Sequence, residues 1–234
     1  MSRNSVLTVV GIVALAGSVA MGQATKEKKP LTTQPAGQPA FELPPGMTEA
    51  DMQACMEAAT PGEMHAHLAQ GVGVWEGKTT MWMTPEAEPM ESTCTTTISP
   101  ILDGRFYKCK TTGDMGGMPF TGLGMYGFDN VAQEFQGTWI DNCGTGMAIG
   151  TGELSSDGET MTWTYEYNCP ITKKPTTLRQ VERHTGKDSM TLEMYGIFPK
   201  TGKEYKMMEI AYTRTSTDVP TETTASASPT SAGH

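Results

Sequence analysis

The chain has 234 residues, of which 37% are hydrophobic, and its 26 acidic and 17 basic side chains give a formal net charge of −9. An acidic chain of this kind is repelled by nucleic-acid phosphates and by anionic membrane surfaces, so neither is expected as a partner. The length suits one domain with a sizeable core.

The first segment, residues 1–24, has the pattern of a secretory signal peptide. Arg3 is its single charge, a long apolar run follows, and small residues permit cleavage after Ala20 or Ala24. The run is shorter than the roughly 20 residues that span a bilayer, which favours a removed peptide over a retained anchor. We therefore expect an exported protein, periplasmic or extracellular, with no membrane span after cleavage.

Two further segments lack the apolar residues that a fold requires. Residues 25–46 are rich in Pro, Lys and Thr and are expected to form a flexible linker. Residues 215–234 consist almost entirely of small, polar and acidic residues and Pro, which predicts a disordered tail.

Residues 47–72 are predicted to form a helical lead-in of two short helices. Thr48, followed three residues later by Asp51, has the pattern of a capping box, and apolar residues then recur at helical spacing. A second helix is expected to start with Pro61 at its first position and Glu63 at its third.

From Gly73 to Arg214 the pattern changes to an alternation of period two that is interrupted by short turns. Short turns make consecutive strands antiparallel, and closing the sheet removes its two edges. We predict a mainly β fold, a single up-and-down antiparallel β-barrel over residues 73–214, wide enough for an interior space. A folded-over sandwich is the alternative. About ten strands are expected, near residues 73–83, 90–99, 105–112, 119–128, 134–141, 146–154, 160–168, 176–184, 189–197 and 204–214.

Aromatic residues alternate along two of these strands. Trp139 shares a face with Asp141, and Trp163 shares one with Tyr165. Pointing inward, these side chains would line a cavity suited to a flat or acyl ligand, although ordinary core packing produces the same pattern. We predict that Trp139, Trp163 and Tyr165 contact a small apolar or amphipathic ligand, and that Asp141 provides a polar contact.

No metal site, cofactor or catalytic residue is predicted. His65 and His67 are two apart, so they face different sides of a helix, and His184 is expected at the surface. The 18 methionines spread over most strands, which favours a pliable apolar lining over a cuprous-ion site. Two alternatives stay open: an enzyme that uses carboxylates such as Asp141 and Glu209 inside the barrel, and a structural or protein-interaction module with a filled barrel.

Five cysteines allow disulfides in an exported protein. Cys143 and Cys169 are expected at the same end of the barrel, separated by one strand. Two strand spacings amount to roughly 9.6 Å, too far for a bond unless a loop folds across, so spacing leaves this pair open.

Cys94 and Cys109 are expected on one hairpin. A two-residue turn at Asp103–Gly104 would place Cys94 opposite Gly113 and Cys109 opposite Ile98. In that register the two sulfur atoms are too far apart to bond.

Several runs between about Thr60 and Arg214 are specific in composition, and together they resemble the domain-of-unknown-function family numbered 1579. The family has no agreed activity, so the resemblance implies a folded unit and no function. Its members lack Cys at positions 143 and 169, so the presence of both here favours that disulfide. The runs are residues 63–68 (EMHAHL), 73–76 (GVWE), 81–85 (MWMTP), 101–106 (ILDGRF), 117–122 (GMPFTG), 127–130 (GFDN), 138–141 (TWID) and 207–214 (MMEIAYTR).

Gly73-x-Trp75 on the first strand and Arg214 on the last are similar, more loosely, to calycin-type barrels: lipocalins, fatty-acid-binding proteins and nitrobindin. In lipocalins a Trp at the barrel base packs under an Arg of the last strand, which implies that Trp75 and Arg214 close the barrel through a cation–π contact. Nitrobindin-like barrels bind haem through a late histidine. The surroundings of His184, the candidate here, do not match that motif.

Overall fold

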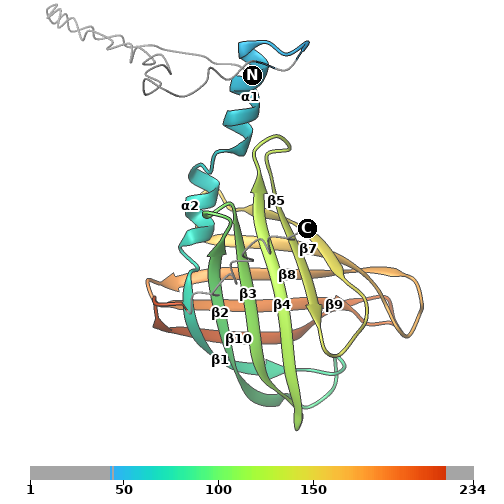
Figure 1. Ribbon diagram of the computed structural model, residues 1–234. Coiled ribbons are helices and arrows are strands. Elements are labelled where there is room, and N and C mark those ends of the chain that lie inside the picture. Colours follow the sequence, from blue (N-terminus) through green and yellow to red (C-terminus); the bar gives the residue numbers. More distant parts are fainter. Residues whose placement is uncertain (1–42, 44, 220–234) are drawn as a thin grey trace, which may run out of the picture. The chain divides into compact units, whose positions relative to one another are not determined.

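The computed structural model describes residue 43 and residues 45–219. The predicted signal peptide, all but a few residues of the predicted linker and most of the predicted tail lie outside these residues. Within them the chain forms a closed barrel of ten strands in which sequence neighbours pair and the last strand pairs with the first (Figure 1). The strands are β1 (Gly73–Met81), β2 (Met90–Ile101), β3 (Phe106–Met115), β4 (Met118–Asp129), β5 (Glu134–Asp141), β6 (Ala148–Leu154), β7 (Thr160–Asn168), β8 (Pro175–Gly186), β9 (Ser189–Ile197) and β10 (Glu204–Ser216).

The predicted up-and-down antiparallel barrel is confirmed, because every neighbouring pair of strands is antiparallel, including β1 with β10. The last strand continues two residues beyond the predicted end at Arg214, to Ser216. The end of the barrel where β1 begins and β10 ends is called the closed end below, and the opposite end is called the mouth.

The register of the β2–β3 hairpin agrees with the sequence prediction. Cys94 lies opposite Gly113, and Ile98 lies opposite Cys109. The turn itself is longer than the predicted two residues, because pairing stops at Ile101 and resumes at Phe106. Positive φ angles in the turn let the chain reverse over this longer loop without changing the register.

Two helices precede the barrel, α1 (Glu49–Ala59) and α2 (Glu63–Ala69). The capping box at α1 is present, since Thr48 Oγ1 accepts a hydrogen bond from the Asp51 backbone and the Asp51 carboxylate accepts one from Thr48 N–H. None of the α1 residues is buried. No helix among the described residues is long and apolar enough to span a membrane.

The start of α2 differs from the prediction. The helix is capped by Gly62, so Pro61 lies before it and not at its first position. The Gly62 N–H donates to His65 Nδ1 at 3.1 Å. An imidazole nitrogen therefore accepts the capping hydrogen bond that was expected to go to the Glu63 carboxylate. His65 is buried, and its carbonyl accepts a hydrogen bond from the Tyr107 hydroxyl at 2.9 Å, which attaches α2 to β3.

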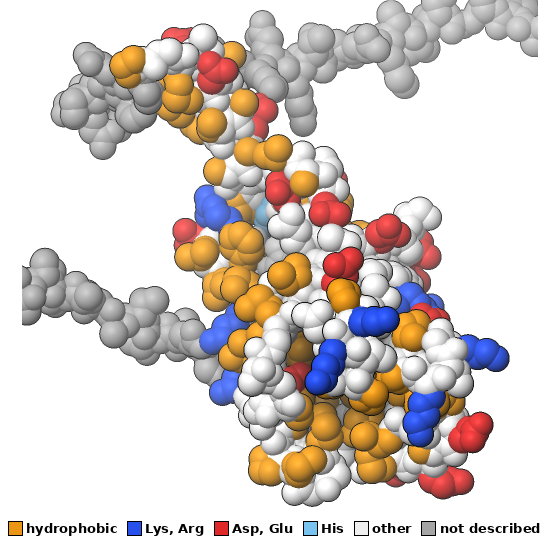
Figure 2. Space-filling view, turned by 90° about the vertical axis from the view of Figure 1, so that its right-hand side faces the viewer, with side chains coloured by type: hydrophobic (Ala, Val, Ile, Leu, Met, Phe, Trp, Pro, Cys, Tyr) orange, Lys and Arg blue, Asp and Glu red, His pale blue; other side chains and the backbone are white. Residues whose placement is uncertain are grey.

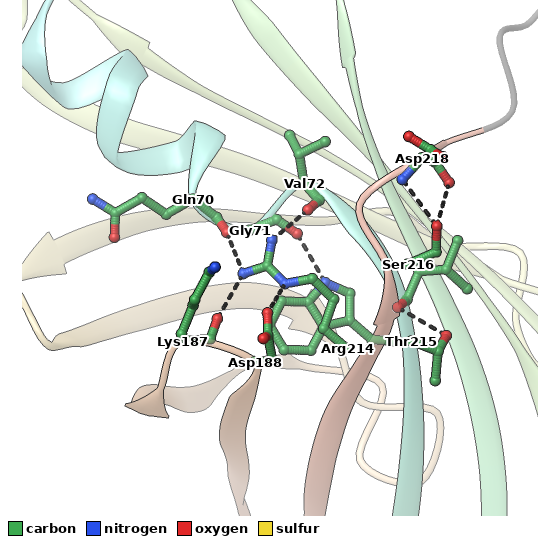
Figure 3. Close-up of polar contacts among 11 residues, drawn as sticks. Gln70, Gly71, Val72, Lys187, Asp188, Arg214, Thr215, Ser216 and Asp218 are labelled. Atoms are coloured by element: carbon green, nitrogen blue, oxygen red, sulfur yellow. Dashed lines mark hydrogen bonds and ion pairs between the residues drawn. The ribbon is translucent and has the colours of Figure 1, made fainter.

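Arg214 joins the closed end of the barrel to the chain that leads from α2 into β1. Its guanidinium lies 4.4 Å from the centroid of the fully buried Trp75 ring. It donates hydrogen bonds to the carbonyls of Val72 (2.7 Å), Gln70 (2.9 Å) and Lys187 (3.0 Å), which converge on it in Figure 3. The Trp75 indole donates to Gly71 O at 2.9 Å, so the pair fixes the backbone on both sides of the seam.

The predicted disulfide between Cys143 and Cys169 is not formed in the structure. All five cysteines are free thiols, with Cys143 exposed and Cys169 buried. The loop after β5 does not fold across to β7, and the Cys143 sulfur instead lies 4.0 Å from the Met115 sulfur on β3. The separation by one strand that the sequence indicated therefore decides against this bond.

Candidate functional site

The barrel encloses a cavity of about 890 Å³. It is lined by side chains from all ten strands and by His67, Leu68 and Gly71 of the α2 region. The exposed members of the lining lie mainly at the mouth, among them Asp114, Cys143 and Met147. Pockets for small organic ligands fall in the range of about 300–1,000 Å³, so this volume suits one ligand of that kind.

The cavity lining is soft and largely apolar. Thioether side chains are flexible and polarisable, so they adapt to ligands of different shape, as the spread of methionines along the sequence indicated. Figure 2 shows hydrophobic side chains gathered on the lower part of the face that it presents, with Lys and Arg side chains among them. The lining methionines are Met81, Met115, Met147, Met161, Met190, Met194, Met207 and Met208.

All four side chains predicted to contact a ligand lie on this lining. Trp163 and Tyr165 are buried on β7, with their rings stacked 6.0 Å apart. Trp139 and Asp141 lie on β5 towards the mouth. The Asp141 carboxylate already accepts hydrogen bonds from the Trp139 indole at 3.0 Å and from the Cys143 backbone at 2.9 Å, so it positions the ring and the following turn. A ligand-binding role for these residues stays a prediction.

Glycines make room for the aromatic rings on the lining. A Cβ atom at Gly122 would lie 2.2 Å from Cζ2 of Trp139, and one at Gly150 would lie 2.6 Å from Cδ1 of Tyr165. Each ring therefore lies flat against the backbone of a neighbouring strand. These two glycines therefore help to determine the shape of the cavity.

Glu182 and Gln180 on β8 also line the cavity, and the sequence analysis missed both. Gln180 Nε2 donates to Glu182 Oε1 at 2.6 Å. Burial raises the pKa of Glu182 from 4.5 to about 7. The part of this side chain that water can reach faces the cavity. Its inward orientation could not be predicted from the alternation of residues, because polar residues occupy both faces of β8.

A second polar group lies on the opposite wall. Thr96 Oγ1 is hydrogen-bonded to Thr111 Oγ1 at 2.8 Å and to the Tyr212 hydroxyl at 3.1 Å. The thiol of Cys94 lies 3.8 Å from the same hydroxyl. These groups satisfy one another, so they add polarity to the wall without needing a ligand.

Two histidines line the closed end. His184 is half-buried there and not at the surface as predicted, and His67 of α2 lies near it. Burial lowers the pKa of both imidazoles, and the neighbouring His184 adds to the shift at His67. Both are therefore neutral near pH 7.

The carboxylate pair suggested for an enzyme is not brought together. Glu209 is absent from the cavity lining, and its carboxylate contacts Lys206 Nζ at 2.8 Å. The alternation of β10 turns Glu209 to the outer face, away from Asp141. Among the described residues there is no cluster of three or more His, Cys, Asp or Glu side chains that could bind a metal ion.

Comparison with known protein families assigns the chain to one of them. Residues 60–214 match the family described as Protein of unknown function (DUF1579), and the chain belongs to that family. This match covers α2 and the barrel almost to its last residue. No curated protein matches the chain.

Solved structures show the same type of barrel. Rv2717c from M. tuberculosis is 15% identical and aligns with a TM-score of 0.50, covering 66% of this chain and 99% of its own. The S-type phycobiliprotein lyase CPES from Guillardia theta is 10% identical, with a TM-score of 0.49, over 71% of this chain and 98% of its own. At such identities the likeness concerns the fold alone.

Proposed function

We propose that this protein binds one small amphipathic molecule inside its barrel. The observation that carries the proposal is the cavity of about 890 Å³, lined by methionines, aromatic rings and a few polar groups. Apolar linings with few, well-placed polar groups are typical of small-molecule sites. A barrel filled by side chains, one alternative of the sequence analysis, does not fit a space of this size.

A pair of substitutions on β2 tests this use of the cavity. Ser92 lines the cavity, whereas the next residue, Thr93, is exposed on the outer face. Trp in place of Ser92 would occupy part of the cavity, so S92W is expected to bind a neutral apolar dye such as N-phenylnaphthylamine about tenfold more weakly or not at all. The control T93W adds the same ring outside and is expected to bind like the wild type. Equal binding by both variants would contradict the proposal.

The natural ligand can be sought by mass. Protein purified from its own host is expected to show, in native mass spectrometry, an excess mass that disappears on denaturation. The excess mass identifies the chemical class of the ligand. A protein that binds the dye at the S92W-sensitive site but carries no excess mass would have lost a weakly bound ligand during purification.

We also propose that the protein acts outside the cytoplasm. The support is the pattern of residues 1–24, a single charge followed by an apolar run and small residues. The mass of the mature protein is expected to correspond to a chain that starts near Thr25. A mature chain that starts at Met1 would overturn this part of the proposal.

A further inference from the structure

The charges on the cavity lining have one sign. Four carboxylic acids line the cavity, Asp114, Asp141, Glu159 and Glu182, whereas none of the described residues that line it is Lys or Arg. A carboxylate or phosphate of a ligand would meet no cationic partner there, and burying an unpaired charge is costly. The lining therefore disfavours anionic amphiphiles such as fatty acids.

Glu182 differs from the other three acids in its position and its partners. Asp114 and Glu159 are exposed, and both oxygens of Asp141 accept hydrogen bonds from the protein. Glu182 lies on the inner face of β8, where its Oε1 accepts one hydrogen bond, from Gln180. No described residue donates to its second oxygen. This carboxyl group can therefore accept a hydrogen bond from a ligand.

Aromatic rings share the cavity lining with Glu182. The Tyr126 and Trp163 rings lie 5.1 Å apart, and the Trp163 ring stacks on Tyr165 at 6.0 Å. Trp163 Nε1 is buried and has no hydrogen-bond partner among the described residues, whereas the Tyr165 hydroxyl interacts with the Tyr126 side chain. The Trp163 and Tyr165 side chains are 2% and 3% exposed, so their rings form a closely packed part of the cavity wall.

The register of β7 and β8 places Glu182 beside these rings, because Trp163 lies directly opposite Gln180, whose side chain donates a hydrogen bond to Glu182. Burial raises the pKa of Tyr165 well above its ordinary value, and the nearby Glu182 carboxylate raises it further. The same two causes, with burial the larger, act on the Cys109 thiol of β3 and bring its pKa to about 12. The carboxyl group and the aromatic rings thus form one site, called the Glu182 site below.

We propose that the cavity takes an amphipathic organic cation, a protonated amine or quaternary ammonium on an apolar body, with its positive group at the Glu182 site. The proposal rests on the function proposed above and names its ligand class. A buried carboxylate is stabilised by a cation that replaces its lost hydration. The faces of Trp and Tyr rings attract the same positive charge.

Binding of a cation is coupled to the titration of Glu182. Cation affinity is expected to rise between pH 6 and pH 8, because the pKa of about 7 means that the acid loses its proton over this range. The groups that face it from the other strands, Tyr126 on β4, Tyr165 on β7 and Cys109 on β3, have pKa values raised by burial and stay neutral there. His184, on β8 itself, has a lowered pKa and gains no charge above pH 7.

Three ligands of equal chain length test the proposal: decylamine, decanol and decanoate, used below their micelle concentrations to displace N-phenylnaphthylamine. At pH 8 decylamine is expected to displace the dye at a concentration about tenfold lower than decanol, and decanoate at a higher concentration than both. The preference for the amine is expected to be smaller at pH 6.

Two matched variants assign the effect to one residue. Glu182→Gln keeps the shape of the side chain and removes its charge, so decylamine is expected to lose about tenfold in affinity while decanol binds as before. Glu166→Gln removes a carboxylate from the exposed face of the neighbouring strand β7 and is expected to change neither. Should Glu182→Gln fail to fold, the order of the three ligands and its pH dependence in the wild type still decide.

The outcomes separate this inference from the proposed function. If the dye does not bind, or if neither decanol nor decylamine displaces it, the proposed function and the inference are both wrong. If the dye and decanol bind but decylamine binds no more tightly than decanol at pH 8, the proposed binding function stands and the cation preference is wrong.

Discussion

Glu182 shows how far the environment of one side chain can change its chemistry. It stands between Val181 and Arg183 in the sequence, like any surface acid of a strand. Inside the barrel it has one hydrogen bond, from Gln180, and burial raises its pKa to about 7. At neutral pH the group is therefore poised between a neutral acid and a buried anion.

The stability of the protein should record this titration. Because the pKa of Glu182 is higher in the folded protein, about 7 against an ordinary 4.5, the folded state binds the proton more tightly. The free energy of unfolding contributed by this group falls as pH rises from about 4.5 to about 7, then levels off, by roughly 2 kcal/mol in total once cavity water is allowed for.

Urea unfolding at pH 5 and pH 8 measures the effect. Glu182→Gln is expected to lack this loss of stability, whereas Glu166→Gln should keep it. His67 and His184, whose lowered pKa values have the opposite effect on stability as pH rises, are present in all three proteins and cancel in the comparison. Identical pH profiles for wild type and Glu182→Gln would contradict the burial of this acid.

A single methyl group added to the lining should also lower the free energy of unfolding. Gly122→Ala would place its Cβ 2.2 Å from the Trp139 ring, so the ring must move. We expect a loss of about 1–3 kcal/mol in the free energy of unfolding and a shifted tryptophan emission spectrum. Gly144→Ala is the control, since nothing lies within 4 Å of a Cβ there. Unchanged stability and emission in Gly122→Ala would show that the ring does not lie against this glycine.

At the scale of elements, the seam between β1 and β10 is held by the side chain of Arg214 in addition to the backbone pairing of the two strands. Its side chain donates to carbonyls of residues 70, 72 and 187, which belong to two connections, the link from α2 to β1 and the β8–β9 turn. It also covers the ring of Trp75. One side chain thereby connects the segment after α2, the first strand and the β8–β9 turn at the closed end.

Removing this side chain should cost more than removing a surface arginine. Arg214→Met removes three hydrogen bonds to carbonyls, the contact with Asp188 and the cation–π contact with the buried Trp75 ring. It is expected to lower the free energy of unfolding by about 3 kcal/mol, with faster amide exchange in α2. Arg179→Met removes a cation–π contact with Tyr195 and an ion pair with Glu204. The side chains of Arg179 and Glu204 are 37% and 45% exposed. The expected cost of Arg179→Met is about 1 kcal/mol or less. Equal losses from the two variants would argue against the role of Arg214 in the seam.

At the scale of the whole molecule, the fold gives the five cysteines different degrees of solvent exposure. Cys55 and Cys143 are exposed, Cys94 is intermediate, and Cys109 and Cys169 are buried. Closure of the sheet places Cys109 inside, where burial raises its pKa to about 12 and keeps it as an unreactive thiol.

Alkylation with iodoacetamide is expected to distinguish the exposed thiols from Cys109. The native protein should react first at Cys55 and Cys143, while Cys109 should react only after unfolding. The denatured, unreduced protein should take up five alkyl groups, because all five cysteines are free. Uptake of three, with a mass two hydrogens lower, would show that one pair is bonded and would contradict the free thiols of the structure.

The sequence by itself determined the architecture. Alternation of period two and short turns fix antiparallel strands, and the register of Cys94 opposite Gly113 followed from the centre of one turn. The same alternation grouped Trp139 with Asp141 and Trp163 with Tyr165, the faces that line the cavity. These features are local, so neighbouring residues suffice to predict them.

The tertiary structure alone decided which face of each strand is inside and how much space remains there. On β8 polar residues occupy both faces, so only closure of the barrel shows that Gln180 and Glu182 point inward. The sequence alone also leaves open which face of β10 carries Glu209. The structure shows it on the outer face, where its carboxylate contacts Lys206. The size of the cavity depends on all ten strands together, because the strands close around a space that no single segment defines.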